Sequence, residues 1–336
     1  MTDFAAYATR VLAGIPLTRS EALDVLAASD SDLRDLLLAA FAVRERYWGR
    51  RVKFCFLRNA RSGLCPEDCG YCSQSTVSTA GIDAYRLLPE DALIEGARSA
   101  VTRGARRYCM VTSGRGPSGR DVAHFASATR AIKAEFPELE ICVSLGIMGE
   151  SEARELKAAG VGWVNHNLNT SARFHRNICT THEYGDRIRT VEAVKRAGLS
   201  TCCGGIVGMG ETDDDIVDLA FALRELEVDS LPVNMLHPIE GTPLAGTTPL
   251  APQRALKALC LFRFTNPSSE IRAAGGREHN LGAWQGLAMY PANSLFIEGY
   301  LTTPGLEEEP TRRLVESLGF VVEEGGEMEF PVEMHA

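Results

Sequence analysis

The sequence predicts an α/β protein built on a (β/α)8 barrel of TIM type, with an N-terminal helical extension and a short C-terminal tail. From residue 51 onward, short runs rich in apolar and β-branched residues alternate with helical runs that end in Gly or Pro. Eight such runs fit into about 250 residues, and no GxGxxG motif follows the first of them. A closed barrel therefore fits better than an open doubly wound sheet. We expect a helical extension over 1–50, the barrel over 51–305, and a helix with a tail over 306–336.

The elements can be assigned in chain order. The segment TRSE at 18–21 fits a capping box in front of an apolar-periodic run, and a second apolar period over 33–41 predicts another helix. The tail is expected to form one helix over 311–320 and then a mobile end. The eight expected strands are 52–58, 106–113, 139–146, 161–168, 200–207, 229–237, 269–274 and 293–300.

Composition and charge exclude several classes of protein. The 336 residues carry a net charge of −9 with no basic run, which disfavours nucleic acid or an anionic membrane as partner. No stretch approaches 18 uninterrupted apolar residues, and the N-terminus lacks the apolar core of a signal peptide. We therefore expect no membrane span and a cytoplasmic location. The ten cysteines then point to metal ligands or reduced thiols instead of a disulfide framework.

Three of these cysteines lie in the motif CPEDCGYC at 65–72. Cys65, Cys69 and Cys72 offer thiolates, the preferred ligands of iron–sulfur clusters and of zinc, and the Pro and Gly between them favour a tight loop. One interpretation is a zinc site with its fourth ligand elsewhere, although no CxxC or HxxxH pair follows downstream. The other is a [4Fe–4S] cluster with one iron left open. The loop follows the first expected strand, where barrel enzymes carry their chemistry.

Three further cysteines, Cys109, Cys142 and Cys202, lie in separate expected strands. A single strand cysteine is usually a small buried apolar residue. Three at similar depth could converge in the lumen and hold a second metal centre. Arg272, on the seventh strand, is a further inward candidate, although a buried Arg paired with a carboxylate would explain it as well. Cys203 adjoins Cys202, so only one of the two can face the lumen.

The chain resembles the biotin synthase family of radical S-adenosylmethionine (SAM) enzymes over roughly residues 15–320, on the motifs GLCPEDCGYCSQS, RRYCMVTSGRG, WVNHNLNTS, CCGGIVGMGET, LPVNMLHPIEGTPL and IRAAGGRE. The resemblance implies a radical SAM enzyme that inserts sulfur into dethiobiotin, the last step of biotin biosynthesis. It implies two iron–sulfur clusters: a [4Fe–4S] cluster with SAM on its open iron, held by Cys65, Cys69 and Cys72, and a [2Fe–2S] cluster held by Cys109, Cys142, Cys202 and Arg272.

The same resemblance implies the remaining site residues. Arg187 matches a position near the SAM carboxylate, where a guanidinium can pair bidentately. Asn169 stands where some family members carry Asp, so it keeps an acceptor oxygen but loses a charge. Ordinary packing would also explain Tyr71 and Ile206. The implied SAM contacts are Tyr71, Asn167, Asn169, Arg187 and Ile206; the implied dethiobiotin contacts are Asn167 and Asn234; and Cys55, Cys179 and Cys260 receive no role beyond packing or spare thiols.

The resemblance further implies a flavodoxin- or ferredoxin-type reductant and a homodimer. Two alternatives remain open. A related radical SAM mutase or cyclase would insert no sulfur, would need only the first cluster, and would use the strand cysteines as core filler. A non-enzymatic protein stabilised by zinc or iron would bind no SAM and would lose stability on chelation.

Overall fold

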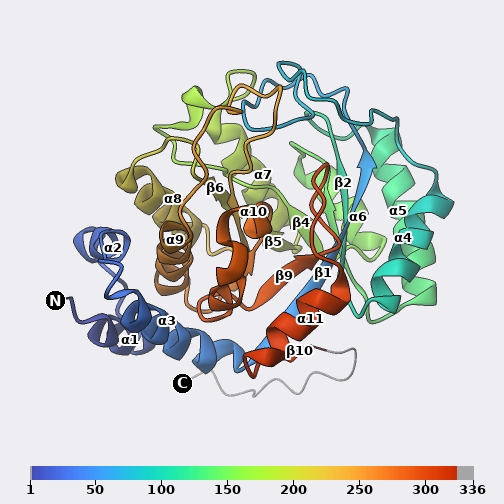
Figure 1. The fold of residues 1–336 in the computed structure, drawn as a ribbon. Coiled ribbons are helices and arrows are strands. Elements are labelled where there is room, and N and C mark those ends of the chain that lie inside the picture. Colours follow the sequence, from blue (N-terminus) through green and yellow to red (C-terminus); the bar gives the residue numbers. More distant parts are fainter. Residues whose placement is uncertain (1, 324–336) are drawn as a thin grey trace.

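The structure, a computed structural model, describes residues 2–323. Its centre is a closed barrel of parallel strands surrounded by helices (Figure 1). Neighbouring strands follow the chain order from β1 to β9, and β1 pairs with β9 to close the ring. The predicted (β/α)8 fold is therefore confirmed. The strands are β1 (Arg51–Arg61), β2 (Arg107–Thr112), β3 (Glu140–Ser144), β4 (Trp163–Asn165), β5 (Ser200–Cys202), β6 (Gly205–Val207), β7 (Ser230–Met235), β8 (Glu270–Ala273), β9 (Ser294–Ile297) and β10 (Val321–Val322).

Helices cover the outside of the barrel (Figure 1). Capping boxes begin α5 and α8, where the side chains of Ser118 and Thr212 accept hydrogen bonds from the backbone N–H three residues on. The helices around the barrel are α4 (Glu90–Thr102), α5 (Gly119–Glu135), α6 (Glu150–Ala158), α7 (Tyr184–Arg196), α8 (Asp213–Glu225), α9 (Pro252–Thr265) and α10 (Arg277–Leu281), with 3-10 turns η1 (His175–Asn177) and η2 (Gly282–Met289).

The strand predicted over 200–207 is interrupted, and this is the main correction to the expected barrel. It forms two short strands, β5 and β6, which both pair with β7. Gly204 lies at the break, and a Cβ placed there would lie 2.0 Å from the carbonyl oxygen of Pro232. The backbones therefore approach too closely for any side chain. The other seven predicted strands are present, with ends that differ by a few residues.

The N-terminal helices α1 (Phe4–Leu12), α2 (Arg19–Leu26) and α3 (Leu33–Trp48) pack on one another and on α8 and α9. The capping box expected at 18–21 is present at the start of α2. Arg44 of α3 is fully buried and donates hydrogen bonds to the carbonyl of Ala292 at 3.2 Å and of Arg51 at 2.7 Å. These carbonyls lie at the amino ends of β9 and β1. The helices are thus fixed at the end of the barrel opposite the carboxyl ends of the strands.

The C-terminal segment confirms the expected helix as α11 (Glu308–Ser317). It then adds β10, which was not expected and which pairs in parallel with the first residues of β1. Two residues are too few to produce a readable pattern. The rest of the expected mobile end, over 324–336, lies outside the described residues. Over residues 2–323, no helix combines the length and the apolar character needed to cross a membrane.

Candidate active site

The carboxyl ends of the strands surround a cavity of about 280 Å³. It is lined by every residue that the sequence singled out as a site candidate, although these residues come from loops, strands and one helix and span more than 200 positions of the chain. The structure thus brings the candidates together, while the ligand of each remains a prediction. The thirteen residues are Cys65, Cys69, Tyr71, Cys72, Cys109, Cys142, Asn167, Asn169, Arg187, Cys202, Ile206, Asn234 and Arg272.

The loop after β1 carries Cys65, Cys69 and Cys72 at the mouth of this cavity. It contains neither helix nor strand, as its Pro and Gly predict. The Gly70 N–H donates to the carbonyl of Ile178 at 2.9 Å, so the loop is held by the segment that precedes α7. Burial raises the pKa of the Cys72 thiol to about 11. A cation that replaces the thiol proton would relieve the cost of burying a thiolate.

Deeper in the cavity, the strand cysteines converge in the lumen. Cys109 and Cys142 lie directly opposite each other in the register of β2 and β3. Contacts with the thiols of Cys109 and Cys202, followed by burial, raise the pKa of Cys142 well above its usual value. A hydrogen bond from Cys142 and the nearby charge of Arg272 hold the pKa of Cys202 well below its usual value. The lumen therefore favours one thiolate, at Cys202.

Arg272 reaches both a carboxylate and this thiolate. Its Nη2 donates to Glu270, its Nε donates to the Ser294 hydroxyl at 3.0 Å, and its Nη1 lies 3.5 Å from Cys202 Sγ. Arg107 binds Glu270 from the other side with two hydrogen bonds of 2.9 and 3.0 Å. Burial alone would raise the pKa of Glu270, but the two guanidiniums outweigh it and hold this pKa well below its usual range. Arg272 therefore makes the carboxylate pair that would explain a buried Arg, and its Nη1 still faces the sulfur of Cys202.

Between mouth and lumen, Asn169 connects Tyr71 to Arg187. Its side-chain oxygen accepts a hydrogen bond from the Tyr71 hydroxyl at 2.5 Å and from the Arg187 guanidinium at 3.2 and 3.3 Å. Its φ of 70° is one that Asn tolerates better than most residues. Tyr71 also packs against a small apolar cluster that contains Ile206. The side-chain oxygen of Asn169 is therefore already hydrogen-bonded to Tyr71 and Arg187.

Arg187 presents an unsatisfied donor at this position. Its Nη1 donates to the carbonyl of Asn167 at 2.8 Å, whereas its Nε is buried with no hydrogen-bond partner among residues 2–323. The Nε2 of His166, which also lines the cavity, is likewise buried and unpartnered within those residues. Buried polar groups are normally hydrogen-bonded, so this wall of the cavity fits a polar, acceptor-bearing ligand. The sequence reasoning missed His166, although it lies inside the motif WVNHNLNTS.

The two residues expected to contact dethiobiotin also hold strand ends in place. The Asn167 side-chain oxygen accepts a hydrogen bond from the Gly204 N–H at 3.0 Å. The Asn234 amide donates to the Gly205 carbonyl at 3.1 Å and accepts from the Gly275 N–H at 3.0 Å. Both side chains line the cavity. Their contact with a substrate stays a prediction.

The cysteines without an assigned role differ in their surroundings. Cys203 and Cys260 are packed in the hydrophobic core. Cys55 lies two residues before the cavity-lining Leu57 on β1, and its Sγ lies 3.5 Å from the Ser294 hydroxyl that binds Arg272, so it faces the lumen. Cys179 Sγ lies 3.7 Å from Cys69 Sγ, beside the mouth loop.

Two family models match successive parts of the chain. Residues 61–223 match the model of the radical SAM superfamily, and residues 232–321 match that of the Biotin and Thiamin Synthesis associated domain. The second match crosses the boundary at 305, so the division of the chain drawn from the sequence stays a prediction.

Curated relatives match almost the whole chain. It is 50% identical over 321 residues to the biotin synthase of Halalkalibacterium halodurans, covering 96% of each protein. It is 49% identical over 328 residues to that of Bacillus subtilis strain 168, covering 98% of each. The crystal structure of methylornithine synthase superposes with a TM-score of 0.83 at 20% identity, covering 94% of this chain and 97% of that one, which shows a shared fold.

Proposed function

The chain belongs to the biotin synthase family of radical SAM enzymes, and we propose from this premise that it converts dethiobiotin to biotin by inserting sulfur. Placing sulfur on unactivated carbon requires a carbon radical, which acid–base side chains cannot generate. One observation carries the proposal: two separate sets of cysteines and an arginine line a single cavity. One cysteine set suffices to make a radical, and the second set explains what the radical is used for.

Membership of the superfamily implies a [4Fe–4S] cluster and SAM. We assign the cluster to Cys65, Cys69 and Cys72 of the mouth loop. These three thiols leave one of four irons without a protein ligand, which is where SAM would bind. The unpartnered Nε of Arg187 supports a role for this side chain in pairing with the SAM carboxylate. In this assignment Tyr71, Asn169 and Ile206 border the rest of the SAM molecule.

We assign a [2Fe–2S] cluster to Cys109, Cys142, Cys202 and Arg272. The fit rests on the donor set and on charge: three buried thiols converge beside a guanidinium that already lowers the pKa of Cys202. When bound, the cluster that carries SAM supplies the hydrogen-abstracting radical and the lumen cluster supplies the sulfur. The protein's own residues hold these partners at different depths of one cavity and exclude water.

Asn167 and Asn234 are proposed to hold the polar groups of dethiobiotin. An amide offers donors and an acceptor without adding charge, which suits the neutral ureido ring. Because backbone hydrogen bonds hold both side chains, they are preorganised for binding. The proposal also includes a flavodoxin- or ferredoxin-type reductant, a homodimer and a cytoplasmic location, as the family resemblance implies.

Anaerobic reconstitution tests the proposal. The protein is loaded with iron and sulfide, supplied with SAM, dethiobiotin and dithionite, and assayed for biotin and 5′-deoxyadenosine. Both products are expected. Absence of both products would overturn the proposal. Formation of 5′-deoxyadenosine without biotin would favour a mutase or cyclase. Cys142→Ala is the matched control, since it should keep SAM cleavage and lose biotin together with one iron signal in the Mössbauer spectrum.

A further inference from the structure

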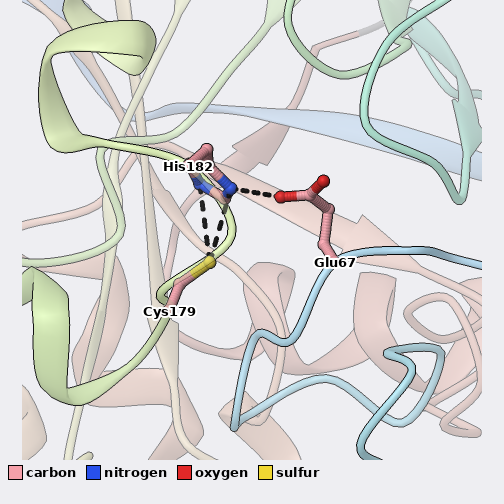
Figure 2. A group of neighbouring side chains, drawn as sticks. All are labelled: Glu67, Cys179 and His182. Atoms are coloured by element: carbon pink, nitrogen blue, oxygen red, sulfur yellow. Dashed lines mark hydrogen bonds and ion pairs between the residues drawn. The ribbon is translucent and has the colours of Figure 1, made fainter.

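The segment between η1 and α7 docks on the mouth loop and forms a cluster of three possible metal ligands (Figure 2). Glu67 comes from the mouth loop, and Cys179 and His182 come from the docking segment. Each offers one ligand atom, all three atoms lie within 4.8 Å of one another, and all three residues are buried. The Glu67 carboxylate binds His182 Nδ1, and Cys179 Sγ lies 3.3 Å from the same nitrogen.

The donor set and its spacing suit a borderline divalent cation. Thiolate, imidazole and carboxylate are the ligands that Zn²⁺ takes in proteins, and imidazole and thiolate also suit iron. Ligand atoms at about 2.0–2.3 Å from a tetrahedral zinc lie about 3.3–3.8 Å from one another. The Cys179–His182 separation of 3.3 Å falls in this range. Glu67 and His182 are joined by a direct hydrogen bond, which would open when a metal takes the place of its proton.

Neighbouring residues hold the ligands in position. Asp68 accepts hydrogen bonds from the backbone N–H groups of Thr180 at 2.9 Å and Thr181 at 3.2 Å, which fixes the turn that carries Cys179. The Thr181 hydroxyl lies 2.7 Å from Glu67 Oε2 and donates to it. Hydrogen bonds of this kind to the ligating side chains orient the ligands of metal sites. Arg115 pairs with the other oxygen of Glu67, at 3.6 Å, and so leaves Oε2 directed at the histidine.

Cys69 is the candidate for a fourth ligand. Its Sγ is 3.7 Å from Cys179 Sγ, which matches the separation of two thiolates on one zinc ion. Cys69 does not belong to the group whose ligand atoms all lie within 4.8 Å of one another, so its side chain would have to turn toward Glu67 and His182 to bind. Cys69 is also the central cysteine of the mouth loop. We propose that Glu67, Cys179 and His182 form a site for Fe²⁺ or Zn²⁺ that recruits Cys69 as its fourth ligand when the neighbouring cluster is absent.

The two metal centres then share one thiol, so they compete for it. Cluster-free protein holds a divalent cation on four protein ligands, and assembly of the cluster on Cys69 reduces the site to three. Glu67, Cys69 and His182 line the cavity, which gives the cation a path of entry. The pattern Cys-Thr-Thr-His at 179–182 is the sequence signal for this site.

Titration with Co²⁺ tests the site directly, because cobalt replaces zinc in such sites and absorbs visible light when thiolates bind it. The background is metal-free, reduced Cys65→Ala/Cys72→Ala protein, which retains all four proposed ligands. Adding Cys179→Ser or His182→Ala should remove one bound Co²⁺ per chain together with its thiolate absorption. Glu67→Gln should weaken binding by about 10-fold or more. The lumen cysteines are the same in every variant, so any Co²⁺ that they bind contributes equally to each measurement.

Cys260→Ser is the matched control, since that thiol is packed in α9, and it should change neither the number of bound ions nor the spectrum. Unchanged binding in Cys179→Ser, His182→Ala and Glu67→Gln would overturn the proposal. Each variant is first checked for an unaltered unfolding midpoint. If neither Cys179→Ser nor His182→Ala folds, Glu67→Gln carries the decision alone.

A second experiment tests the sharing of Cys69. Zn²⁺ is added before iron and sulfide, and growth of the [4Fe–4S] absorption is followed in otherwise unmodified protein and in Cys179→Ser. Zinc should slow assembly in the former much more than in the latter, whereas an equal delay would overturn the sharing. Neither experiment uses SAM or dethiobiotin, so a negative result here leaves the test of biotin formation unaffected.

Discussion

The mouth and the lumen of the cavity hold their cysteines in different ways. At the mouth, Cys65, Cys69 and Cys72 lie on a loop that depends on hydrogen bonds to a segment more than 100 residues away. In the lumen, Cys109, Cys142 and Cys202 lie on strands whose register fixes their positions. The loop can therefore adjust around a ligand, while the strands present their thiols at set positions.

The two regions also differ in charge. In the lumen, the buried cations Lys53, Arg107 and Arg272 face two carboxylates, Glu140 and Glu270, so three positive charges meet two negative ones. The remaining positive charge favours a thiolate or an anionic cluster. At the mouth, carboxylates stand beside the cysteines instead, as at Glu67 and Asp68. The lumen thus carries an excess of positive charge, whereas the mouth combines its carboxylates with the guanidiniums of Arg115 and Arg187.

The largest expected effect separates the two regions by activity. Cys65→Ala should abolish both 5′-deoxyadenosine and biotin, because it removes a ligand of the cluster that binds SAM. Cys109→Ala should abolish biotin and leave reductive cleavage of SAM measurable. Both products are measured in the two variants after anaerobic reconstitution. If both variants lose both products, the division of labour between mouth and lumen is wrong.

The second effect concerns stability and belongs to the lumen alone. Glu270→Gln should lower the free energy of unfolding of the cluster-free protein by about 3–5 kcal/mol, because it leaves buried Arg107 and Arg272 without their shared carboxylate. Urea unfolding measures the change. Glu135→Gln, which breaks an exposed pair with Arg98, should cause no measurable loss. Similar midpoints for the two variants would mean that the lumen charges are screened like surface charges.

A third effect tests whether a buried carboxylate also stabilises the rim of the mouth. Asp215 accepts hydrogen bonds from Ser171 at 2.6 Å and from Arg173 at 2.7 Å, and so ties the chain after Asn169 to α8. Burial would raise the pKa of Asp215, but the hydrogen bonds from Ser171, Thr212 and Arg173 outweigh it and hold this pKa below its ordinary value. A lowered folded-state pKa stabilises the protein above the unfolded pKa of about 3.9, and this stabilisation is lost as pH falls toward the folded-state pKa.

Asp215→Asn should therefore be less stable than the unsubstituted protein at neutral pH. Its urea midpoint should also fall less steeply between about pH 5 and pH 3, so that the two proteins converge in acid. Parallel pH profiles would show that Asp215 does not contribute through its charge.

The comparison also explains what could be predicted from the sequence. The lumen candidates could be predicted because Cys109, Cys142 and Cys202 each fall inside a separate expected strand at similar depth. The mouth motif could be predicted from the sequence because its three cysteines are close together in the chain. The break at Gly204 depends on Pro232 across the sheet, and the contact of Cys69 with Cys179 joins positions 110 residues apart. Neither leaves a local pattern, so only the structure reveals them.

The smallest expected effect tests strand parity in the lumen. Cys202 lines the cavity, whereas its neighbour Cys203 is packed in the hydrophobic core, where burial raises its pKa to about 12. Cys203→Ala should therefore cost about 1 kcal/mol of stability and leave iron content and biotin formation unchanged. Cys202→Ala should lose the lumen iron and biotin formation at little cost in folding. The two substitutions delete the same atom from adjacent residues, so each is the control for the other. The reverse outcome would mean that the strand turns its other face to the lumen. The assignment of the lumen cluster would then be wrong.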